Sequence, residues 1–352
     1  IGSGISGLAA AYLLRKKYQI SLYEKNAYYG GHARTIMVKD TPIDTGFIVF
    51  NYETYPHLSA FFKHLLVPVK KSTMSFGVSI NQGQLEYGTE RFLDIFAQKS
   101  NIFRPQFIGM LRDITKFNKA AKQFLSHAKM DASMTLRDFL DSLGLGEYFR
   151  NYYLLAMGAS IWSTPSMQML DFPALSFLRF FNNHGLLSIQ APVQWYTVDG
   201  GSKVYTEKVM KILKQDQLQL CTGATQVKRH KNTVTITDTQ GQARDYDGVI
   251  FATHSDEALS LLTDPTDQEA SLLGDLRYQS NQMVLHTDTR FMPKRKRAWS
   301  SWVYLSEQEK GLDQRISLSY WMNNLQSLAC DTQYFVTINP GTWPKEETII
   351  DQ

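Results

Sequence analysis

Three glycines at the start of the chain, Gly2, Gly4 and Gly7, have the spacing of a turn that binds the pyrophosphate of a dinucleotide. Gly2 permits a tight turn from strand to helix, Gly4 lets a pyrophosphate approach the backbone, and Gly7 lets the following helix pack closely on the sheet. The unpaired N–H groups and the positive dipole end of that helix favour an anion. The residues between the glycines, which belong to the same candidate site, are Ser3, Ile5 and Ser6.

An acidic residue follows at the distance that a ribose requires. Glu24 comes directly after a predicted strand over residues 19–23, and its carboxylate could accept hydrogen bonds from both hydroxyls of an adenosine ribose. A carboxylate at this position disfavours a 2′-phosphate, so the pattern predicts a cofactor without one. Lys25 lies next to it and is included in the candidate site.

A second glycine motif at residues 30–35 separates two classes of dinucleotide. It supplies more bare backbone and a cation near the pyrophosphate, which a simple nicotinamide dehydrogenase does not need there. The motif therefore favours a flavin dinucleotide, although a glycine turn with a surface arginine would have the same pattern. Its members are Gly30, Gly31, His32, Ala33, Arg34 and Thr35.

Two later segments could complete the cofactor site. The backbone of residues 225–228, which include Val227, could flank an adenine. Residues 248–253 are expected to form a buried strand that ends in small residues beside the cofactor. Either segment alone could equally be a core strand. The remaining candidates for contact with the cofactor are Thr45, Gly46, Phe47, Ala252, Thr253 and His254.

The order of predicted elements indicates an α/β protein with two domains. After the opening βαβ unit, residues 54–187 are mostly helical, with helices expected over 55–66, 89–98, 104–128 and 135–143 and a hairpin at 74–87 that turns at 81–83. Dinucleotide-type elements return from residue 203, with a meander expected over 224–229 and 233–238. We therefore expect a discontinuous Rossmann-like FAD-binding domain at 1–53 and 190–262, and an α+β substrate domain at 54–189 and 263–352. Only Ile1 remains of the first strand, so that strand and the C-terminal segment of the cofactor domain are expected to be missing.

Composition sets limits on partners and location. The chain has 352 residues and a formal charge of only +4, which does not favour nucleic-acid binding. Its two cysteines suit a reducing, cytoplasmic compartment and provide neither a disulfide framework nor a metal site. The basic run at 293–297 could touch anionic lipids or be a solvated loop, and the apolar segment 172–187 could line a cavity or lie on a membrane. The sequence does not determine the oligomeric state.

At these residues the chain resembles the flavin-containing amine oxidase superfamily. It is most similar to a bacterial family of predicted NAD/FAD-binding proteins, which also resembles the flavin domain fused to plant cyclopropane fatty acid synthases. The resemblance implies FAD bound along a discontinuous Rossmann-like domain, a substrate domain of the amine oxidase type, and a lipid acyl substrate. The segments that carry it are 44–51, 74–76, 159–163, 179–184, 277–279, 285–288 and 299–302.

One departure from the superfamily bears on the chemistry. Amine oxidases usually place a lysine beside the flavin in a strand of the substrate domain, where this chain has Gln282. Amine oxidation is therefore not the expected reaction. The sequence does not identify catalytic residues. Polar groups that could take part are Asp44, His184, His254 and His286, and aromatic residues that could line the pocket are Trp162, Trp299, Trp302 and Tyr320.

These observations predict an FAD-dependent oxidoreductase that transfers a hydride from a hydrophobic, lipid-derived small molecule to the flavin. Three alternatives remain open. The protein could be a non-catalytic flavoprotein partner of a lipid-modifying methyltransferase, or a flavin amine oxidase. A nicotinamide-dependent dehydrogenase is disfavoured by the second glycine motif. Peripheral contact with a membrane is compatible with the lipid-derived substrate.

Overall fold

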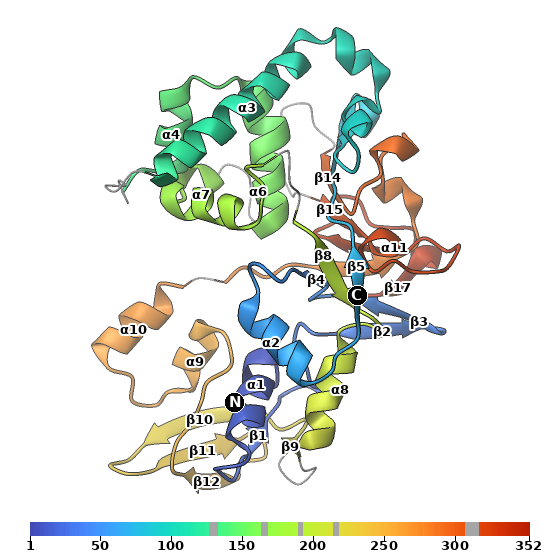
Figure 1. Cartoon of the computed structure of the whole chain (residues 1–352). Helices are drawn as coiled ribbons and strands as arrows, with labels where there is room; N and C mark the ends of the chain where they lie inside the picture. Colours follow the sequence, from blue (N-terminus) through green and yellow to red (C-terminus); the bar gives the residue numbers. More distant parts are fainter. Residues whose placement is uncertain (127–132, 163–167, 189–192, 214–217, 277, 307–316) are drawn as a thin grey trace. The chain divides into compact units, whose positions relative to one another are not determined.

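The computed structural model describes residues 1–126, 133–162, 168–188, 193–213, 218–276, 278–306 and 317–352. These residues form two compact units, whose elements are labelled in Figure 1. Unit 1 comprises Ile1–Ile48, Ala60–Pro68 and Val198–Ser280, and unit 2 comprises Val49–Ser59, Val69–Thr197 and Asn281–Gln352. Both units contain helices and strands, so the predicted α/β class is confirmed.

In unit 1, short backbone segments pair with one another beside the N-terminus of the chain. Its helices and strands are α1 (Ile5–Leu14), β1 (Leu22–Tyr23), β2 (Thr35–Val38), β3 (Thr41–Asp44), α8 (Lys203–Ile212), β9 (Leu218–Gln219), β10 (Ala224–Arg229), β11 (Val234–Asp238), β12 (Ala243–Tyr246), α9 (Ser255–Leu261) and α10 (Asp267–Gly274). Strand β1 pairs in parallel with β9, and the Gly2 N–H donates to the Tyr23 carbonyl at 2.9 Å. Ile1 forms two hydrogen bonds with the segment 250–252. Its amine donates to the Ile250 carbonyl, and its carbonyl accepts the Ala252 N–H, both at 2.8 Å.

The expected strand at 248–253 is wrong in two respects. The segment is not a regular strand, and it is not fully buried, because Ile250 is 51% exposed. Only Val249 and Phe251, on the alternate side, pack against the core around Tyr23 and Val227. The continuous apolar run indicated a strand that is covered on both faces. In the structure only one face of the segment is covered, so the predicted burial is wrong. The segment still lies beside Ile1, as the cofactor prediction requires.

The other sheets of unit 1 are antiparallel. Strands β10, β11 and β12 form a three-stranded meander, and β2 and β3 form a hairpin. The hairpin turns at Lys39, which has a positive φ of 54°. The predicted meander is confirmed, with β12 as an additional third strand. Helix α1 contacts α8, and its inward residues Leu8 and Ala11 are buried.

Unit 2 consists of two sheets and a group of helices. Its regular elements are β4 (Val49–Phe50), α2 (Pro56–His64, which continues into unit 1), β5 (Val69–Ser72), β6 (Phe76–Ile80), η1 (Asn81–Gly83), β7 (Leu85–Gly88), η2 (Phe92–Phe96), η3 (Lys99–Phe103), α3 (Pro105–Ser126), α4 (Leu136–Leu143), α5 (Glu147–Phe149), η4 (Arg150–Leu154), α6 (Leu155–Trp162), η5 (Gln168–Asp171), α7 (Ala174–Asn183), β8 (Trp195–Val198), β13 (Met283–His286), η7 (Thr289–Phe291), η8 (Lys296–Ala298), β14 (Trp302–Ser306), β15 (Ser317–Trp321), α11 (Met322–Leu325), β16 (Phe335–Ile338), η9 (Glu346–Thr348) and β17 (Ile349–Asp351). The predicted hairpin at 74–87 is confirmed as β6, η1 and β7.

A seven-stranded sheet with the order β17-β13-β16-β15-β14-β6-β7 dominates unit 2. All its pairs are antiparallel except β14 with β6. Residues paired across neighbouring strands share a face. We call one face the aromatic face; along strands β6, β7 and β13 to β16 its paired residues are Phe76, Val78, Ile80, Leu85, Tyr87, Met283, Leu285, Trp302, Tyr304, Ser306, Leu318, Tyr320, Val336 and Ile338.

Helices of unit 2 pack on the aromatic face and share one hydrophobic core with it. In α3 the buried apolar residues Phe107, Met110, Phe117 and Ala121 recur at helical spacing, as the sequence predicted. Helix α4 begins at a capping box between Thr135 and Asp138. Helix α6 contacts β14 of the sheet. The core of unit 2 therefore lies between the helices and this face.

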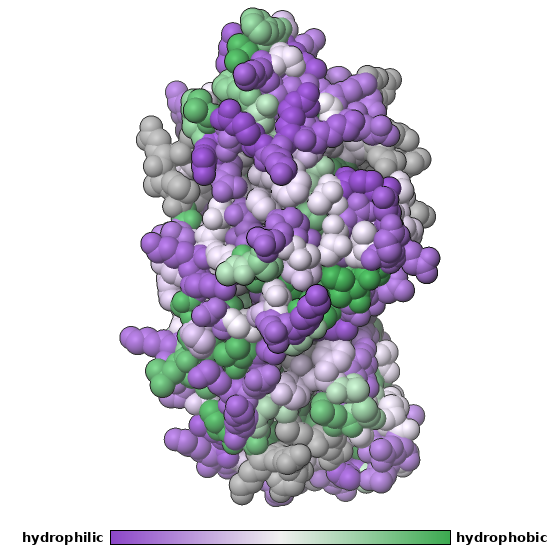
Figure 2. All heavy atoms as spheres, turned by 90° about the vertical axis from the view of Figure 1, so that its right-hand side faces the viewer, coloured by the Kyte–Doolittle hydropathy of each residue, from purple (hydrophilic) through white to green (hydrophobic). Residues whose placement is uncertain are grey.

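The helix expected over residues 89–98 is wrong. The chain instead forms the two 3-10 turns η2 and η3, which Figure 1 draws in teal before α3. Gln98 accepts a hydrogen bond from the Glu86 N–H at 2.8 Å, and the Asn101 amide donates to the Glu86 carbonyl at 3.0 Å. These side chains satisfy backbone groups of β7, the last strand of the sheet, and an α-helix would not bring both to it. In Figure 2, green apolar spheres stand among purple ones at this end of unit 2, the top of the view.

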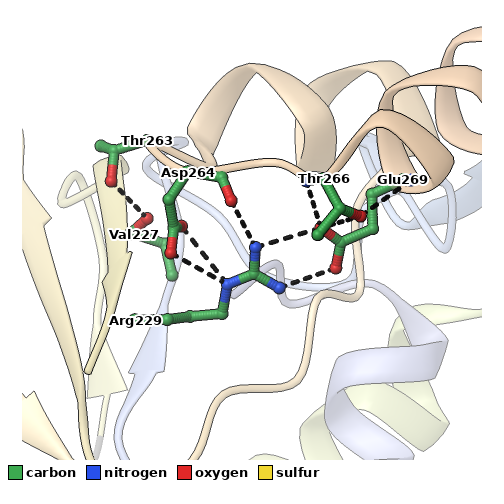
Figure 3. A network of polar contacts seen from close by, with 6 residues as sticks. All are labelled: Val227, Arg229, Thr263, Asp264, Thr266 and Glu269. Atoms are coloured by element: carbon green, nitrogen blue, oxygen red, sulfur yellow. Dashed lines mark hydrogen bonds and ion pairs between the residues drawn. The ribbon is translucent and has the colours of Figure 1, made fainter. Parts of the chain in front are cut away.

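The unit boundaries differ from the predicted ones in three places. Residues 263–280 lie in unit 1, because Arg229 of β10 binds the Asp264 carboxylate at 3.3 Å and Glu269 of α10 at 2.7 Å (Figure 3). Residues 60–68 also lie in unit 1, where Phe61 packs edge-on against Tyr12 of α1. Residues 49–53 and 193–197, which were expected in the cofactor domain, lie in unit 2, where β4 and β5 both pair with β8.

Candidate functional site

The first glycine turn leads directly into α1. Gly2 has a φ of +93°, which favours glycine, and Gly4 is the N-cap residue of the helix. A Cβ at Gly7 would overlap the Gly2 carbonyl oxygen, whereas a Cβ at Gly4 would meet nothing within 4 Å. Among the described residues, no side chain caps the helix, and its first turn, which contains Ile5 and Ser6, has no acidic residue. The N–H groups of this turn are thus available to an anion.

The second glycine motif lies against the first. The Gly30 N–H donates to the Ser3 carbonyl at 2.9 Å, and Gly31, with φ +57°, approaches Gly4 so closely that a Cβ on Gly31 would lie 3.0 Å from the Gly4 Cα. Ala33 is buried and its N–H closes the turn on the Gly30 carbonyl at 2.9 Å. The structure therefore brings both predicted glycine motifs together, with bare backbone on each side.

Glu24 is buried, 6% exposed, and its carboxylate is fully hydrogen-bonded within the chain. Oε2 accepts from the N–H of Ser3 at 3.0 Å and from its hydroxyl at 2.6 Å. Oε1 accepts from the N–H and the side-chain amide of Asn26, both at 2.9 Å. A carboxylate has about four lone-pair sites, so a ribose that binds Glu24 must displace a side-chain donor. The sequence interpretation missed Asn26, whose N–H two residues after Glu24 lies within reach of that carboxylate.

Neighbouring backbone is held close to the second glycine motif. A Cβ at Gly46 would overlap the His32 carbonyl oxygen, which accepts the Phe47 N–H at 2.7 Å. The Arg34 carbonyl accepts the Thr45 N–H at 2.9 Å, and the Arg34 guanidinium lies 5.2 Å from the ring centre of Tyr28. The predicted residues at 32–34 and 45–47 are therefore adjacent, as expected for one site.

Thr35 belongs to a buried polar cluster with Asp44 and Ser202. The Thr35 hydroxyl donates to the Asp44 carboxylate at 2.5 Å, and both the N–H and the hydroxyl of Ser202 donate to it at 2.8 Å. Burial raises the pKa of Asp44 to about 6, although the hydrogen bonds from Thr35 and Ser202 oppose this shift. The cluster joins the β2–β3 hairpin to the start of α8. The sequence interpretation missed Ser202. The adjacent glycines Gly200 and Gly201 indicate a turn directly before it, and both have a positive φ in the structure.

Three exposed rings lie next to the first turn. His254 stacks on Tyr278 with ring centres 4.0 Å apart and an angle of 4°, and His32 lies 6.3 Å from His254 on nearly parallel planes. A Cβ at Gly2 would lie 2.7 Å from the Ala252 carbonyl oxygen and 3.3 Å from the Thr253 methyl group. Residues 252–254 therefore lie beside the glycine turn as predicted, and the sequence interpretation missed Tyr278.

Two predicted residues point elsewhere. Lys25 forms an exposed ion pair with Glu257 at 2.6 Å, which raises the pKa of Lys25. Val227 is buried and packs on Tyr23, and its carbonyl accepts the Thr263 N–H at 3.1 Å and the Thr263 hydroxyl at 3.3 Å, the contact drawn in Figure 3. The Lys25 side chain is therefore turned toward α9, and the Val227 carbonyl already has a partner.

The residues of unit 1 fit a dinucleotide. The open space at Gly4, the uncapped N-terminus of α1 and the close approach of Gly31 form a cradle that a Cβ would fill. The neighbouring carboxylate of Glu24 is of the type that binds ribose hydroxyls. Among the described residues, no group of three or more His, Cys, Asp or Glu side chains could hold a metal ion.

In unit 2, the aromatic residues proposed for a pocket lie in different places. Trp302 and Tyr320 are cross-strand partners on the aromatic face, with ring centres 5.6 Å apart. The Trp302 Nε1–H is buried and has no hydrogen-bond partner among the residues that the structure describes, and burial raises the pKa of Tyr320 to about 12. Trp162 of α6 packs within the helical core. Trp299 packs beyond the opposite face of the sheet with Phe335, so its assignment to the same wall is wrong.

The polar candidates of unit 2 are engaged in structural contacts. His286 is fully buried on the opposite face, where Nδ1 accepts the Asp288 N–H at 3.1 Å and Nε2 lies 2.7 Å from the Thr337 hydroxyl. Burial lowers the pKa of His286 to about 4. His184 stacks on Phe180 at 3.8 Å. Gln282 precedes β13 and is exposed. Two residues of the resemblance segments, Ser163 and Arg277, lie outside the described residues.

Both cysteines, Cys221 and Cys330, are free thiols in the structure. No helix in the described part of the chain has the length and apolar character needed to cross a membrane.

Comparison with known proteins identifies the family. Residues 5–347 match the family described as flavin containing amine oxidoreductase. Cyclohexylamine oxidase from Brevibacterium oxydans IH-35A superposes with a TM-score of 0.66 at 15% identity, covering 96% of this chain and 73% of that one. A CLA-producing fatty acid isomerase from P. acnes superposes with a TM-score of 0.65 at 15% identity, covering 99% and 77%. These likenesses show a shared fold.

A curated relative gives a short match of higher identity. The 1-hydroxycarotenoid 3,4-desaturase of Flavobacterium sp. (strain P99-3) is 51% identical over 59 residues, which are 16% of this chain and 12% of the desaturase. The predicted FAD cofactor and the predicted resemblance to amine oxidases are confirmed by the family match, which spans nearly the whole chain. The chain belongs to the flavin-containing amine oxidoreductase family.

Proposed function

We propose that this flavin oxidoreductase acts on a hydrophobic, lipid-derived substrate. Bound FAD supplies the acceptor for a hydride from such a substrate. The observation that carries the proposal is the part of the aromatic face around Trp302 and Tyr320, which are only partly buried, whereas its residues on β6 and β7 are packed into the core with the helices. Along six described strands its paired residues are apolar, aromatic or hydroxyl-bearing, and none of them is charged. A face of this kind suits an acyl chain better than an ammonium group, which would require a partner for its charge.

The residues of unit 1 have distinct roles in holding the cofactor. The backbone of Gly2, Gly4 and Gly31 and the first turn of α1 bind the pyrophosphate. Glu24 binds the adenosine ribose once a hydroxyl has replaced the Ser3 hydroxyl or the Asn26 amide. Strand β10, in which only Val227 is buried, and the segment 252–254 border the remaining surface of the cofactor.

Trp302 and Tyr320 orient the substrate in this proposal. The buried Trp302 N–H lacks a partner within the described part of the chain, and an unsatisfied buried donor is costly unless a ligand completes it. Tyr320, like any tyrosine, is neutral at physiological pH, burial raises its pKa further to about 12, and its hydroxyl can donate or accept. Both groups could therefore bind an oxygen of the substrate without introducing a charge.

Two similar proteins have names compatible with a lipid-derived substrate, namely a fatty acid isomerase and a carotenoid desaturase. Gln282 stands where amine oxidases usually have a lysine, which disfavours amine oxidation. A reducing cytoplasmic location and contact with a membrane surface are compatible with the proposal. The free thiols of Cys221 and Cys330 agree with such a compartment.

Anaerobic reduction of the flavin tests the proposal. The purified protein, loaded with FAD, is mixed without oxygen with long-chain acyl lipids and, separately, with primary amines and polyamines, while the flavin absorbance is followed. We expect bleaching by an acyl lipid and none by the amines. Bleaching by amines alone would establish amine oxidation instead. A flavin that no donor reduces, although dithionite reduces it, would favour the non-catalytic partner.

Variants of the aromatic face sharpen this experiment. Trp302→Phe removes the unpartnered N–H but keeps an aromatic ring, so we expect an increase in KM of about 5- to 100-fold with normal FAD binding. Trp299→Phe is the matched control, because Trp299 packs on the other side of the sheet. Equal effects of the two substitutions on KM would contradict the assignment of the substrate to the aromatic face.

A further inference from the structure

We propose that unit 2 carries a docking surface for an anionic lipid bilayer, formed by the turns η2 and η3 and by the basic run at 293–297. We call this surface the basic apolar patch. Its apolar members are Phe92, Leu93, Ile102 and Phe103. The inference concerns binding to a surface and does not depend on the chemistry proposed for the aromatic face.

The apolar members of the patch are unusually exposed. Phe92 is 74% and Leu93 is 64% exposed, and Ile102 and Phe103 are 51% and 86% exposed. Single exposed apolar residues are normal, but a group of four large side chains on two adjoining turns is the kind of feature that marks an interaction site. Figure 2 shows green side chains at this end of unit 2.

Polar side chains of the turns lie beneath the patch, next to Ile95 and Phe96, which pack against the core of unit 2. Gln98 and Asn101 are 5% and 0% exposed and are bonded to the backbone of β7 and the residue before it. Arg104 also reaches this end of the strand, where its guanidinium donates to the Gln84 carbonyl at 2.8 Å. Because these polar side chains face inward and bond the backbone of residues 84 and 86, Phe92 and Phe103 are held outward. The turns thus present Phe92 and Phe103 on a preformed scaffold.

The basic run lies beside these turns, since η8 contacts both η2 and β7. The buried carboxylate of Glu86 accepts from the N–H of Lys294 at 2.7 Å and pairs with the Arg295 guanidinium at 2.7 Å. Arg297 pairs with Asp94 at 3.5 Å. These contacts anchor the run by its backbone and by two of its arginines.

The remaining cations of the patch face solvent. Lys294 and Lys296 are exposed, and in the part of the chain that the structure describes neither forms an ion pair. Arg91 and Lys99 are exposed on the turns themselves. Glu86 and Asp94 are already paired with arginines of the run, and the exposed Glu90 offsets only one of these four exposed cations, so the accessible charge of the patch is positive.

A bilayer with anionic headgroups fits both features at once. Aromatic and aliphatic side chains enter the boundary between headgroups and acyl chains, and lysines beside them bind the anionic headgroups. A protein partner would need a shape complementary to four protruding side chains, whereas a bilayer accepts them without one. The positive charge also opposes contact between two copies of the same patch.

Vesicle binding tests the inference. The FAD-loaded protein is sedimented with vesicles of phosphatidylcholine alone and of phosphatidylcholine with phosphatidylglycerol, at low and high salt. We expect binding to the anionic vesicles, weaker at high salt. The double variant Phe92→Ser/Phe103→Ser should bind at least about 10-fold more weakly. Leu272→Ser, at an apolar residue that is 61% exposed in α10 of unit 1, is the matched control and should bind like the wild type.

A second pair of variants tests the charge separately. Lys294→Gln/Lys296→Gln should weaken binding to anionic vesicles by about fivefold per lysine, which corresponds to about 1 kcal/mol each, and should not change the midpoint of thermal unfolding. Lys211→Gln, at an exposed lysine of α8, is the control. Equal binding to neutral and anionic vesicles, or unchanged binding by both patch variants, would overturn the inference. So would a dimer that the Phe92→Ser/Phe103→Ser substitutions convert to a monomer, because a second copy would then cover the patch.

Discussion

The candidate cofactor site of unit 1 is made mainly of backbone, whereas the candidate substrate surface of unit 2 is made of side chains. In unit 1, Gly2, Gly4 and Gly31 matter because they lack a Cβ, and the helix that receives the anion starts within the same turn. In unit 2, the paired residues Trp302 and Tyr320 come from separate strands, and the face they share is defined only by the sheet.

This difference has a physical basis. A pyrophosphate is bound by N–H groups and a helix dipole, which any sequence supplies if its glycines permit the turn. An apolar substrate is bound by shape, which depends on which side chains a sheet places on one face. Substitutions of the glycines in unit 1 should therefore weaken FAD binding by filling the space of the pyrophosphate. Substitutions in unit 2 should act by removing single buried polar groups.

The largest expected effect comes from Gly7→Ala compared with Gly4→Ala. A Cβ at Gly7 would overlap the Gly2 carbonyl, so we expect a loss of more than about 4 kcal/mol in the free energy of unfolding, together with loss of FAD. A Cβ at Gly4 meets open space, so that variant should keep its stability and lose FAD affinity. Urea denaturation and FAD titration measure the two effects. Equal stability losses would show that Gly4 is required for the fold and not for the ligand.

The next prediction compares two buried ionisable groups, one in each unit. The pKa of Asp44 is raised to about 6 from 3.8, so the folded state binds more protons, and the free energy of unfolding falls as pH rises from 4 to 6. The pKa of His286 is lowered to about 4 from 6.5, so its contribution rises as pH increases from 4 to 6.5. Each contribution is of order ~3 kcal/mol.

Substitutions separate these opposing slopes. Asp44→Asn keeps an oxygen that can accept from Thr35 and Ser202. It should remove the contribution to the free energy of unfolding that falls as pH rises. His286→Asn should remove the contribution that rises with pH. The urea midpoint measured between pH 4 and 7 should therefore increase more steeply with pH in the Asp44 variant than in the wild type, and less steeply in the His286 variant. Parallel curves for all three proteins would contradict both assignments.

A smaller effect is expected at Glu24. Glu24→Ala removes the acceptor for the ribose hydroxyls, so FAD affinity should fall by about 1.5–3 kcal/mol. Asn26→Ala removes only one internal donor and leaves a lone pair for a ribose hydroxyl, so it should bind FAD at least as tightly as the wild type. Both dissociation constants follow from quenching of flavin fluorescence. If Asn26→Ala weakened binding as much as Glu24→Ala, Glu24 would act by holding the turn and not by contacting the ribose.

The smallest effect separates the two faces of the sheet in unit 2. Trp299→Phe loses a hydrogen bond of 2.8 Å from Nε1 to the Pro293 carbonyl, whereas Trp302→Phe loses none to the described residues. The Trp299 variant should therefore be less stable than the Trp302 variant by about 1 kcal/mol. Thermal unfolding of the two proteins without substrate measures the difference. The reverse order would mean that the Trp302 N–H has a partner in solution.

Local patterns predicted much of this molecule. The glycine spacing predicted the turn into α1, the acidic residue predicted a carboxylate beside it, and alternating and helical periodicities predicted the hairpin at 74–87 and helix α3. These features depend on residues close in sequence. The strand expected at 248–253 was wrong because its partner Ile1 is distant in sequence. The helix expected at 89–98 was wrong because the side chains of Gln98 and Asn101 bond the backbone of β7.

The sequence by itself determined the cofactor class, because a turn of glycines followed by an acid specifies where backbone N–H groups and a carboxylate lie within about 25 residues. Only the tertiary structure decided that Asn26 and Ser3 occupy the lone pairs of Glu24, that Ser202 joins Asp44, and that Trp302 and Trp299 lie on opposite sides of one sheet. Those relations arise from strand pairing and burial between distant segments, which local periodicity does not encode.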